Sequence, residues 1–250
     1  MLKTILVETS GRTTTVTLNR PDKLNAFNAD IVRELQEAVY QAEKSETRVL
    51  LFKGEGKGFS GGFDLSDLES ASDGDLLRRF VQVEELLQTV YHSPLATVAM
   101  VHGPCYGAAA DLVAACKWRL GTPDCRFRMP GLRFGIVLGT KRLTNLVGAD
   151  KARALLLRDK PFGAEEALDS GFLTEICERE VWDLRFDKIK HDGLALSAEA
   201  FEALSDRTVI DTRDADLVAL IKSVCQGSIK DRITAYLETV KAKPKENRSR

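Results

Sequence analysis

Two turns in the sequence combine small residues in a way that leaves backbone N–H groups open to a ligand. The first, Gly61-Gly62 before Phe63, ends a glycine-rich segment that follows an apolar run. The second, His102 to Gly107, follows another apolar run and leads into a segment that starts with three alanines. Small residues at a helix start let a ligand approach the unpaired N–H groups, where the helix dipole favours negative charge. Together the two turns could form an oxyanion hole, which stabilises negative charge developing on a carbonyl oxygen.

Asp111 is the candidate acid or base beside the second turn. It is the only polar residue in the segment AAADLVAAC (108–116), and it lies in the first turn of the helix expected there. Burial would raise the pKa of its carboxyl, whereas the helix N-terminus would lower it. An unpaired buried carboxylate is costly, so we expect Asp111 either to cap the helix or to transfer protons.

The glycines of the first turn do not match the common phosphate-binding motifs. Their positions (54, 56, 58, 61 and 62) do not give the GxGxxG spacing, and Gly56-Lys57 lacks the Walker spacing and the following Ser or Thr. We therefore interpret residues 54–58 as a surface turn and Gly61-Gly62 as a tight turn that exposes N–H groups.

Cysteine and histidine are spaced unlike metal ligands. The chain has five cysteines and three histidines, without a CxxC or HExxH pattern. We expect no metal site, and we expect the cysteines to be small buried side chains in a reducing compartment. They are Cys105, Cys116, Cys125, Cys177 and Cys225.

Other polar residues are weaker candidates. His102 could face the site or satisfy backbone groups at the end of a strand, and Arg133 could pair with Asp111 or with a substrate carboxylate. Three further cations are expected to be solvated surface charges, with a smaller chance of meeting phosphates: Lys57, Arg78 and Arg79.

Alternating strands and helices must position these residues. A β-branched run over 12–19 predicts a strand that pairs with residues 3–8 across the Ser10-Gly11 turn. Short continuous apolar runs at 49–52 and 95–101 predict strands covered on both faces. Apolar residues at helical spacing predict helices over 29–43, 75–92, 108–116, 149–158, 163–170, 181–205 and much of the last fifty residues. The fold class is therefore α/β, with a helical C-terminal part in the same domain.

Composition narrows the function classes. The 250 residues are 44% hydrophobic and 29% charged, which excludes a disordered chain. The net charge of -1 gives no sign of a general nucleic-acid binder. No apolar run approaches the length of a membrane span, and the amino terminus lacks the pattern of a secretory signal. We expect a soluble cytoplasmic protein that binds neither nucleic acid nor membrane.

Four segments in order resemble successive signatures of the enoyl-CoA hydratase/isomerase (crotonase) family. They are TLNRP (17–21), KLNAF (23–27), GFSGGFDL (58–65) and HGPCYGAAADL (102–112), and the resemblance extends over about residues 5–175. It implies a spiral of ββα units over residues 1–195 and a helical trimerisation region over 196–250. It also implies an acyl-CoA thioester as substrate, no cofactor besides that coenzyme A, and a homotrimer or a dimer of trimers.

The resemblance also implies roles for individual residues. The N–H groups of Phe63 and Ala108 would polarise the thioester carbonyl, and Asp111 would be the acid or base. Substrate contacts are expected from residues in both turns and beyond: Lys23, Leu24 and Ala26 on coenzyme A, Gly62, Asp64 and Leu65 along the pantetheine and acyl pocket, and Tyr106, Pro130 and Gly131.

The sequence departs from the family's hydratases at both acid/base positions. Those enzymes use two glutamates, whereas here the first position is Asp111 and the second is Gly131, after Pro130. Aspartate is shorter by one methylene, about 1.5 Å, and loss of one acid/base group typically costs about 10²–10⁴ in rate. These departures weaken the case for water addition more than the case for thioester binding, and one carboxylate suits a double-bond shift at least as well as hydration. From the resemblance we expect an enzyme of the enoyl-CoA hydratase or isomerase type, a lyase or isomerase of fatty-acid metabolism. The alternatives are thioester hydrolysis or decarboxylation on the same fold, or an acyl-CoA-binding protein with weakened catalysis.

Overall fold

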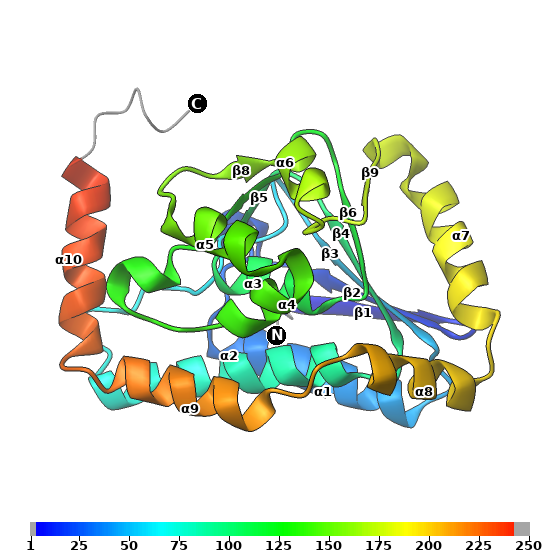
Figure 1. Ribbon diagram of the computed structural model, residues 1–250, viewed down its shortest axis with the longest axis horizontal. Helices are drawn as coiled ribbons and strands as arrows, with labels where there is room; N and C mark the ends of the chain where they lie inside the picture. Colours follow the sequence, from blue (N-terminus) through cyan, green and yellow to red (C-terminus); the bar gives the residue numbers. More distant parts are fainter. Residues whose placement is uncertain (1–3, 243–250) are drawn as a thin grey trace.

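A mostly parallel sheet forms the centre of the computed structural model, which describes residues 4–242 (Figure 1). The strand order is β1-β2-β3-β4-β6-β9. The strands are β1 (Ile5–Ser10), β2 (Thr13–Leu18), β3 (Val49–Gly54), β4 (Ala96–Val101), β6 (Trp118–Gly121) and β9 (Glu175–Ile176).

The expected hairpin and buried strands are confirmed. β1 and β2 pair antiparallel, with Ile5 opposite Leu18, and the remaining pairs in this sheet are parallel. All residues of β4 are buried, as are all but Lys53 of β3. The predicted start of the first strand at Lys3 lies outside the described residues.

A second, smaller sheet carries the chain into the site. It consists of β5 (Pro104–Tyr106), β7 (Arg126–Arg128) and β8 (Phe162–Gly163), with β5 and β7 parallel. Phe127 of β7 packs against Phe162 and Phe172, with ring centroids 5.4 and 4.8 Å away. Because β5 leads directly into the next helix, this packing fixes where that helix starts.

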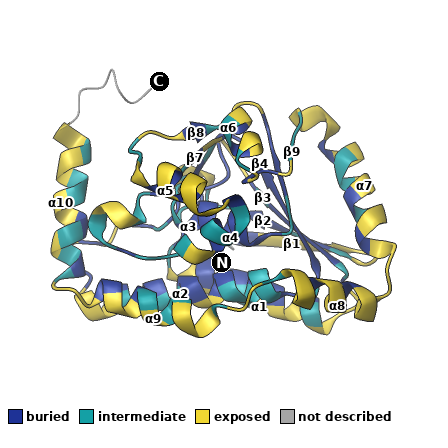
Figure 2. Ribbon diagram, in the orientation of Figure 1, coloured by how far each residue is buried: buried dark blue, intermediate teal, exposed yellow. Residues whose placement is uncertain are grey.

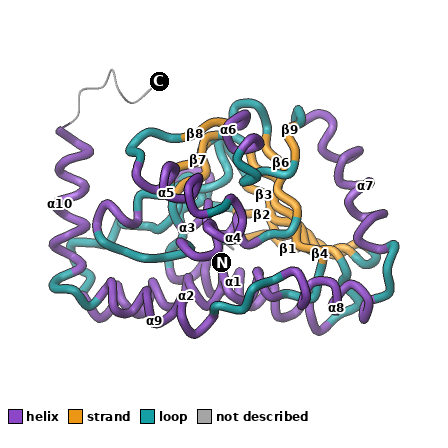
Figure 3. The backbone as a smooth tube through the Cα atoms, viewed as in Figure 1, coloured by secondary structure: helices purple, strands orange, loops and turns teal. Residues whose placement is uncertain are grey.

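Helices cover both sheets, and Figure 3 shows the strands gathered inside them. Asn28 caps α1 by accepting a hydrogen bond from the Ile31 N–H, and Ser72 and Asp75 form a capping box at the start of α2. The helices of the first two thirds of the chain are α1 (Ala29–Lys44), α2 (Asp73–His92), α3 (Ala108–Ala115), α4 (Thr140–Val147), α5 (Ala149–Leu157) and α6 (Ala164–Asp169). Every residue of α3 is buried, as the prediction from AAADLVAAC required (Figure 2).

The C-terminal part is helical, as predicted, but its first helix is interrupted. The predicted helix over 181–205 is wrong, because the chain forms α7 (Trp182–Leu194) and α8 (Ala198–Thr208). Ser197 is extended between them and caps α8 by accepting from the Ala200 N–H, a position that serine favours over a helix interior. α9 (Arg213–Val224) and α10 (Ile229–Ala242) follow.

The last two helices reach the candidate site. α9 packs along α2, and α10 stands against the short turn Gly131–Phe134 (Figure 1). Within residues 4–242, no helix has the length and apolar content needed to cross a membrane.

Candidate active site

The two small-residue turns lie side by side. The Ser60 N–H donates to the Pro104 carbonyl (3.1 Å), and the Tyr106 N–H donates back to the Ser60 carbonyl (2.9 Å). A Cβ placed on Gly62 would lie 2.3 Å from the Tyr106 carbonyl oxygen, so only glycine allows this approach. Gly62 also has φ +85°, which disfavours any other residue. The chain thus brings two segments more than forty residues apart into direct backbone contact.

The segment before α1 holds the first turn in place. The Phe27 N–H donates to the Gly62 carbonyl (2.7 Å), and the Asp64 N–H donates to the Phe27 carbonyl (3.0 Å). Asn25, which is fully buried, donates its side-chain amide to the Phe59 carbonyl (3.0 Å). Phe27 thus holds both neighbours of Phe63, Gly62 and Asp64, through hydrogen bonds that do not use the Phe63 N–H.

The N–H groups of Phe63 and Ala108 are both available to a ligand. Among residues 4–242, neither donates a hydrogen bond to another protein group. Ala108 is the first residue of α3, whose first internal bond runs from the Asp111 N–H to the Gly107 carbonyl (3.1 Å). Both residues line the same cavity. The cavity is therefore lined by two residues whose N–H groups have no acceptor among the described residues.

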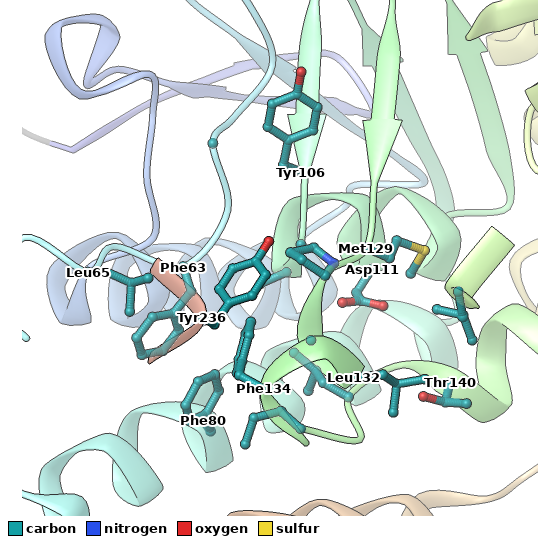
Figure 4. Close-up of a pocket in the computed structure, with 18 residues that line it drawn as sticks. Phe63, Leu65, Phe80, Tyr106, Asp111, Met129, Leu132, Phe134, Thr140 and Tyr236 are labelled. Carbon is teal, nitrogen blue, oxygen red and sulfur yellow. The ribbon is translucent and has the colours of Figure 1, made fainter. Parts of the chain in front are cut away.

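The cavity has a volume of about 120 Å³ and mostly apolar walls (Figure 4). Its apolar side chains come from α2, the turn before α4, and the loop after Gly62, among them Phe63, Leu65, Phe80, Phe134, Ile136 and Leu138. Polar side chains among its described lining residues belong to Tyr106, Asp111, Thr140 and Tyr236. Such a cavity excludes water from an apolar chain while leaving a few polar groups to act on it.

Asp111 carries a buried carboxyl that lines the cavity. The residue is 5% exposed, and within residues 4–242 its Oδ1 atom is buried and unpaired. Burial raises the pKa of Asp111 to about 8, while the positive charge of Arg142 lowers it and Glu84 raises it further. An unpaired acid in a ligand-sized cavity is typical of a proton-transfer group. The structure gives no support to the capping alternative.

Arg142 supplies the positive charge near Asp111 without bonding to it. Its guanidinium forms a two-bond ion pair with Glu84 (2.8 and 2.5 Å), and both side chains are almost fully buried. Asp216 of α9 lies 3.4 Å away from the same guanidinium. The pair ties α4 to α2 and α9, so Arg142 is held near Asp111 but remains occupied by Glu84.

The second acid/base position is Gly131, which has no carboxylate. Pro130 and Gly131 line the cavity, and Asp111 is the one acidic residue among its described lining residues. A Cβ on Gly131 would lie 3.1 Å from the Ile136 carbonyl oxygen, so even a small side chain there would be tight. The shortened segment after this position thus closes around the glycine.

The structure places the expected substrate-binding residues in two groups. Leu65, Pro130 and Gly131 line the cavity, whereas Tyr106 lines it with its ring turned away from the other side chains in Figure 4. The remainder lie in or beside the first turn and do not line the cavity: Lys23, Leu24, Ala26, Gly62 and Asp64.

Leu24 and Asp64, two of the residues that do not line the cavity, form specific contacts with neighbouring residues. The Leu24 carbonyl accepts from the Gly61 N–H (2.7 Å), and Lys23 is exposed. Asp64 is buried against Arg20 (2.9 Å) and accepts from the Ser66 N–H, and these contacts keep its pKa below the ordinary value although burial acts in the opposite direction.

Arg79 corrects one sequence prediction. It is buried rather than solvated, pairs with Asp67 (2.8 Å), donates to the Asp64 carbonyl (2.7 Å) and lies 4.4 Å from the centre of the Phe63 ring. The sequence alone did not indicate this burial, because Arg79 forms its contacts with a loop that lies twelve or more residues before it. Arg79 therefore stabilises the residues that directly follow the first turn. Lys57 and Arg78 are exposed, as predicted.

Arg133 and His102 do not act on the cavity. Arg133 is exposed and donates to the Leu157 carbonyl, so the predicted pairing with Asp111 is wrong. His102 is buried and its Nε2 bonds the Gly56 carbonyl (2.9 Å), which is the structural alternative considered for it. Cys225 is exposed and Cys177 half-buried, against expectation, whereas the other cysteines are buried. In the part of the chain described, no three His, Cys, Asp or Glu side chains cluster as a metal site would require.

Two residues that line the cavity, Thr140 and Tyr236, were not predicted from the sequence. Thr140 begins α4 beside Asp111, and Tyr236 enters from α10, where it accepts a hydrogen bond from Arg128 (2.8 Å). The placement of Tyr236 follows only from how α10 folds back onto the core. Thr140 had one usable signal, because it follows Gly139 where a helix can start.

The amino-acid sequence is similar to the sequences of known proteins. A sequence model of the enoyl-CoA hydratase/isomerase family matches residues 8–247. A Mycobacterium tuberculosis protein named probable enoyl-CoA hydratase echA6 is 33% identical over 174 residues, covering 67% of this chain and 70% of that protein. The trans-2-decenoyl-[acyl-carrier-protein] isomerase of Streptococcus mutans is 30% identical over 195 residues, covering 75% and 74%.

Solved structures agree with the sequence comparisons. A crystal structure of a Bordetella parapertussis protein assigned to the enoyl-CoA hydratases/isomerases superimposes with a TM-score of 0.92 at 42% identity, covering 96% of this chain and 99% of that one. An enoyl-CoA hydratase/isomerase structure from Xanthobacter autotrophicus has a TM-score of 0.82 at 24% identity, covering 96% and 93%, and shows the likeness in fold.

Proposed function

The chain belongs to the enoyl-CoA hydratase/isomerase family, and from this premise we propose that it is an enzyme that forms a thioester enolate from an acyl-CoA. The observation that carries the proposal is the pair of free N–H groups, on Phe63 and Ala108, in a cavity that also holds an unpaired carboxyl. Such donors act on charge that develops in the transition state, and each is worth about 10²–10³ in rate.

The thioester carbonyl oxygen would accept from both N–H groups. Asp111 stands one helical turn after Ala108, about 4.5 Å further along the helix axis. That spacing suits a base acting on the carbons next to the carbonyl, because those carbons lie a few ångströms from the oxygen. The enolate formed by removing an α-proton would place its charge on the oxygen held by the two turns.

A single carboxylate is sufficient for double-bond isomerisation. Asp111, in its ionised form, takes a proton from the α-carbon of a 3-enoyl thioester, and the electron pair moves to the carbonyl oxygen. The same carboxyl then returns the proton to the γ-carbon, and the double bond moves to the 2,3 position. Hydration of a 2-enoyl thioester needs a bound water in addition, so both reactions belong to the proposal. The names of relatives include hydratases and an isomerase.

Coenzyme A would extend from the first turn across the segment before α1. Lys23 is exposed in this segment. The Leu24 carbonyl accepts a hydrogen bond from the Gly61 N–H of the first turn, and the Ala26 carbonyl accepts one from the Arg20 side chain (2.5 Å). These three residues are the proposed coenzyme-binding residues, and the proposed enzyme uses no cofactor beyond the coenzyme A of its substrate.

We also propose that the enzyme is a cytoplasmic homotrimer or a pair of such trimers. Large apolar side chains on the C-terminal helices are exposed in the single chain, and they would be covered by other copies. They include Leu184, Leu204 and Val218, which are 69, 50 and 48% exposed. Light scattering coupled to gel filtration gives the mass that tests this.

The activity is tested by giving the protein a 2-enoyl-CoA and a 3-enoyl-CoA of matched chain length and following the absorbance of the conjugated thioester. Hydration lowers the absorbance of the first, and isomerisation raises that of the second. No change with either, over several chain lengths, would contradict the proposal. If acyl-CoA still bound, the result would favour an acyl-CoA-binding protein, which the missing carboxylate at Gly131 also suggests.

A further inference from the structure

Thr140 places a second unpaired polar group in the cavity beside Asp111. Its hydroxyl oxygen is buried and, among the residues described, has no hydrogen-bond partner. Thr140 lines the cavity, as Asp111 does. A buried hydroxyl or carboxyl without a partner costs free energy, so two of them in one apolar cavity indicate that a ligand supplies the partner.

The two groups belong to the same wall. A Cβ on Gly139, the residue before Thr140, would lie 1.9 Å from the Asp111 Oδ1 atom, so the start of α4 packs directly against the carboxyl. Figure 4 shows Thr140 and Asp111 on one side of the cavity, with the Thr140 hydroxyl turned inward and Tyr236 on the other side. Tyr236 and Tyr106 therefore do not compete for this position.

Their position relative to Ala108 sets the part of the substrate that they reach. Asp111 is three residues after Ala108 on α3, and residues at this spacing have Cβ atoms about 5–6 Å apart on one helix face. With the carbonyl oxygen at the Ala108 N–H, the α- and β-carbons of the acyl group lie between that oxygen and the Asp111 carboxyl. Besides Asp111 and Thr140, the polar side chains among the described lining residues are Tyr106 and Tyr236, and the other lining side chains are apolar.

We propose that Thr140 and Asp111 together bind a single oxygen atom on the β-carbon of the acyl thioester. That oxygen is the water that hydration adds, and it becomes the hydroxyl of a 3-hydroxyacyl product. The inference rests on the proposed function, and it assigns to the Thr140 hydroxyl the water-holding task for which Gly131 has no side chain.

The step balances with one carboxylate. The bound water donates one hydrogen to the Asp111 carboxylate and the other to the Thr140 hydroxyl oxygen, which leaves a lone pair directed at the β-carbon. As the O–Cβ bond forms, the water's proton passes to Asp111 and the π pair of the 2,3 double bond moves to the thioester oxygen. Asp111 then gives that proton to the α-carbon, so the net change is the addition of water.

The charged groups near Thr140 and Asp111 come from three helices. On α4 itself Arg142 faces Asp111, on α2 Glu84 holds Arg142, and on α9 Asp216 approaches the same guanidinium. Burial raises the pKa of the Cys105 thiol of β5, and the charges of Cys125 and Asp111 raise it further. Thr140 carries no charge, so replacing it should change binding of the oxygen without changing the charge near Asp111.

The first test compares binding of 3-hydroxybutyryl-CoA and butyryl-CoA by calorimetry. The wild type should prefer the hydroxylated ligand about fivefold to tenfold, the yield of one or two hydrogen bonds. Thr140→Val, which keeps the shape and removes the hydroxyl, should lose this preference, whereas Thr140→Ser should keep it. Thr144→Val is the matched control, because the Thr144 hydroxyl donates to the Thr140 carbonyl within α4 and does not line the cavity.

The second test separates water binding from enolate formation. Exchange of the α-hydrogens of butyryl-CoA in deuterium oxide needs the two N–H groups and Asp111 but no bound water. Thr140→Val should therefore exchange at the wild-type rate within about twofold while hydrating crotonyl-CoA roughly tenfold to a hundredfold more slowly, because the lost hydroxyl misplaces the water.

The outcomes distinguish this inference from the proposed function. Equal binding of the two ligands by the wild type, an unchanged preference in Thr140→Val, or an equal loss of exchange and hydration in that variant would overturn the role of Thr140. Exchange without any hydration by the wild type would overturn it as well, and would leave enolate formation standing. Failure to bind either ligand or to exchange would overturn the proposed function itself, and the inference with it.

Discussion

The two halves of the candidate site are built differently. The half that would hold the thioester oxygen consists of backbone N–H groups, on Phe63 and Ala108, presented by turns that pack against each other through glycine. The half that would move protons and water consists of side chains, Asp111 and Thr140, on the wall formed by α3 and α4. The first half follows its family pattern closely, and the second departs from it.

The difference has a physical origin. A backbone donor is fixed by the path of the chain, so the side chain at the same residue can vary as long as the turn is kept. A side-chain acid is altered by one substitution, and a displacement of about 1 Å can cost on the order of a hundredfold in rate. The proposed binding of a thioester therefore depends on the path of the chain, whereas the proposed chemistry depends on single side chains.

Replacing Asp111 by asparagine tests the side-chain half and should have the largest effect. Asn cannot accept the proton, so kcat/KM should fall by about 10²–10⁴, while butyryl-CoA should still bind through the two N–H groups. Stopped or continuous assays with both enoyl-CoA isomers and a binding titration measure this. Unchanged turnover would remove Asp111 from the mechanism.

Replacing Gly62 by alanine tests the backbone half. The new Cβ would collide with the Tyr106 carbonyl oxygen and force the turn open, so the Phe63 N–H should lose its aim and kcat/KM should fall by about 10²–10³. Gly11→Ala is the matched control, because Gly11 also has positive φ (+56°) but has open space around it. Activity in Gly62→Ala equal to that of the control would show that the turn is not part of the site.

The pH dependence of the rate tests the environment of Asp111. Burial raises its pKa to about 8, so at lower pH the carboxyl is mostly protonated and cannot act as a base. We expect kcat/KM to rise about tenfold per pH unit up to that value and then to level. Lys117, whose pKa burial lowers to about 8, lies outside the cavity, so Lys117→Arg should leave the profile unchanged. A profile that is flat between pH 6 and 8 would contradict an unpaired Asp111.

Replacing Phe63 by leucine should have the smallest effect on rate. The N–H group remains, so kcat/KM should stay within about threefold of the wild type. The ring, however, stacks on Phe80 at 4.3 Å and lies under Arg79, so the free energy of unfolding should fall by about 1–2 kcal/mol. Assay and thermal denaturation together check the contrast. A hundredfold loss of rate would mean that the side chain itself acts on the substrate.

The parts of this site that were predictable from sequence are those set by local chain geometry. Gly62 and the alanines after Gly107 indicated turns with open N–H groups, and the lone Asp111 in an apolar helix indicated a buried acid. Each of these depends on neighbours within a few residues, as do the strands β3 and β4 and the helix α3.

The parts that escaped prediction depend on distant contacts. Arg79 was predicted to be a surface cation because its partner Asp67 and the Phe63 ring lie in the loop before α2, outside the helix that carries Arg79. Tyr236 reaches the cavity only through the docking of α10. The break at Ser197 could have been found, since a serine inside a helix pattern is also a good N-cap. The second sheet is made of strands of two or three residues, too short to show a period.

The most direct test of the central claim is a crystal structure with an unreactive acyl-CoA, such as butyryl-CoA, bound. The account predicts that the thioester oxygen lies about 2.7–3.2 Å from the nitrogen atoms of both Phe63 and Ala108, with the β-carbon facing Asp111 and Thr140. A thioester oxygen held elsewhere, out of reach of these two N–H groups, would contradict it.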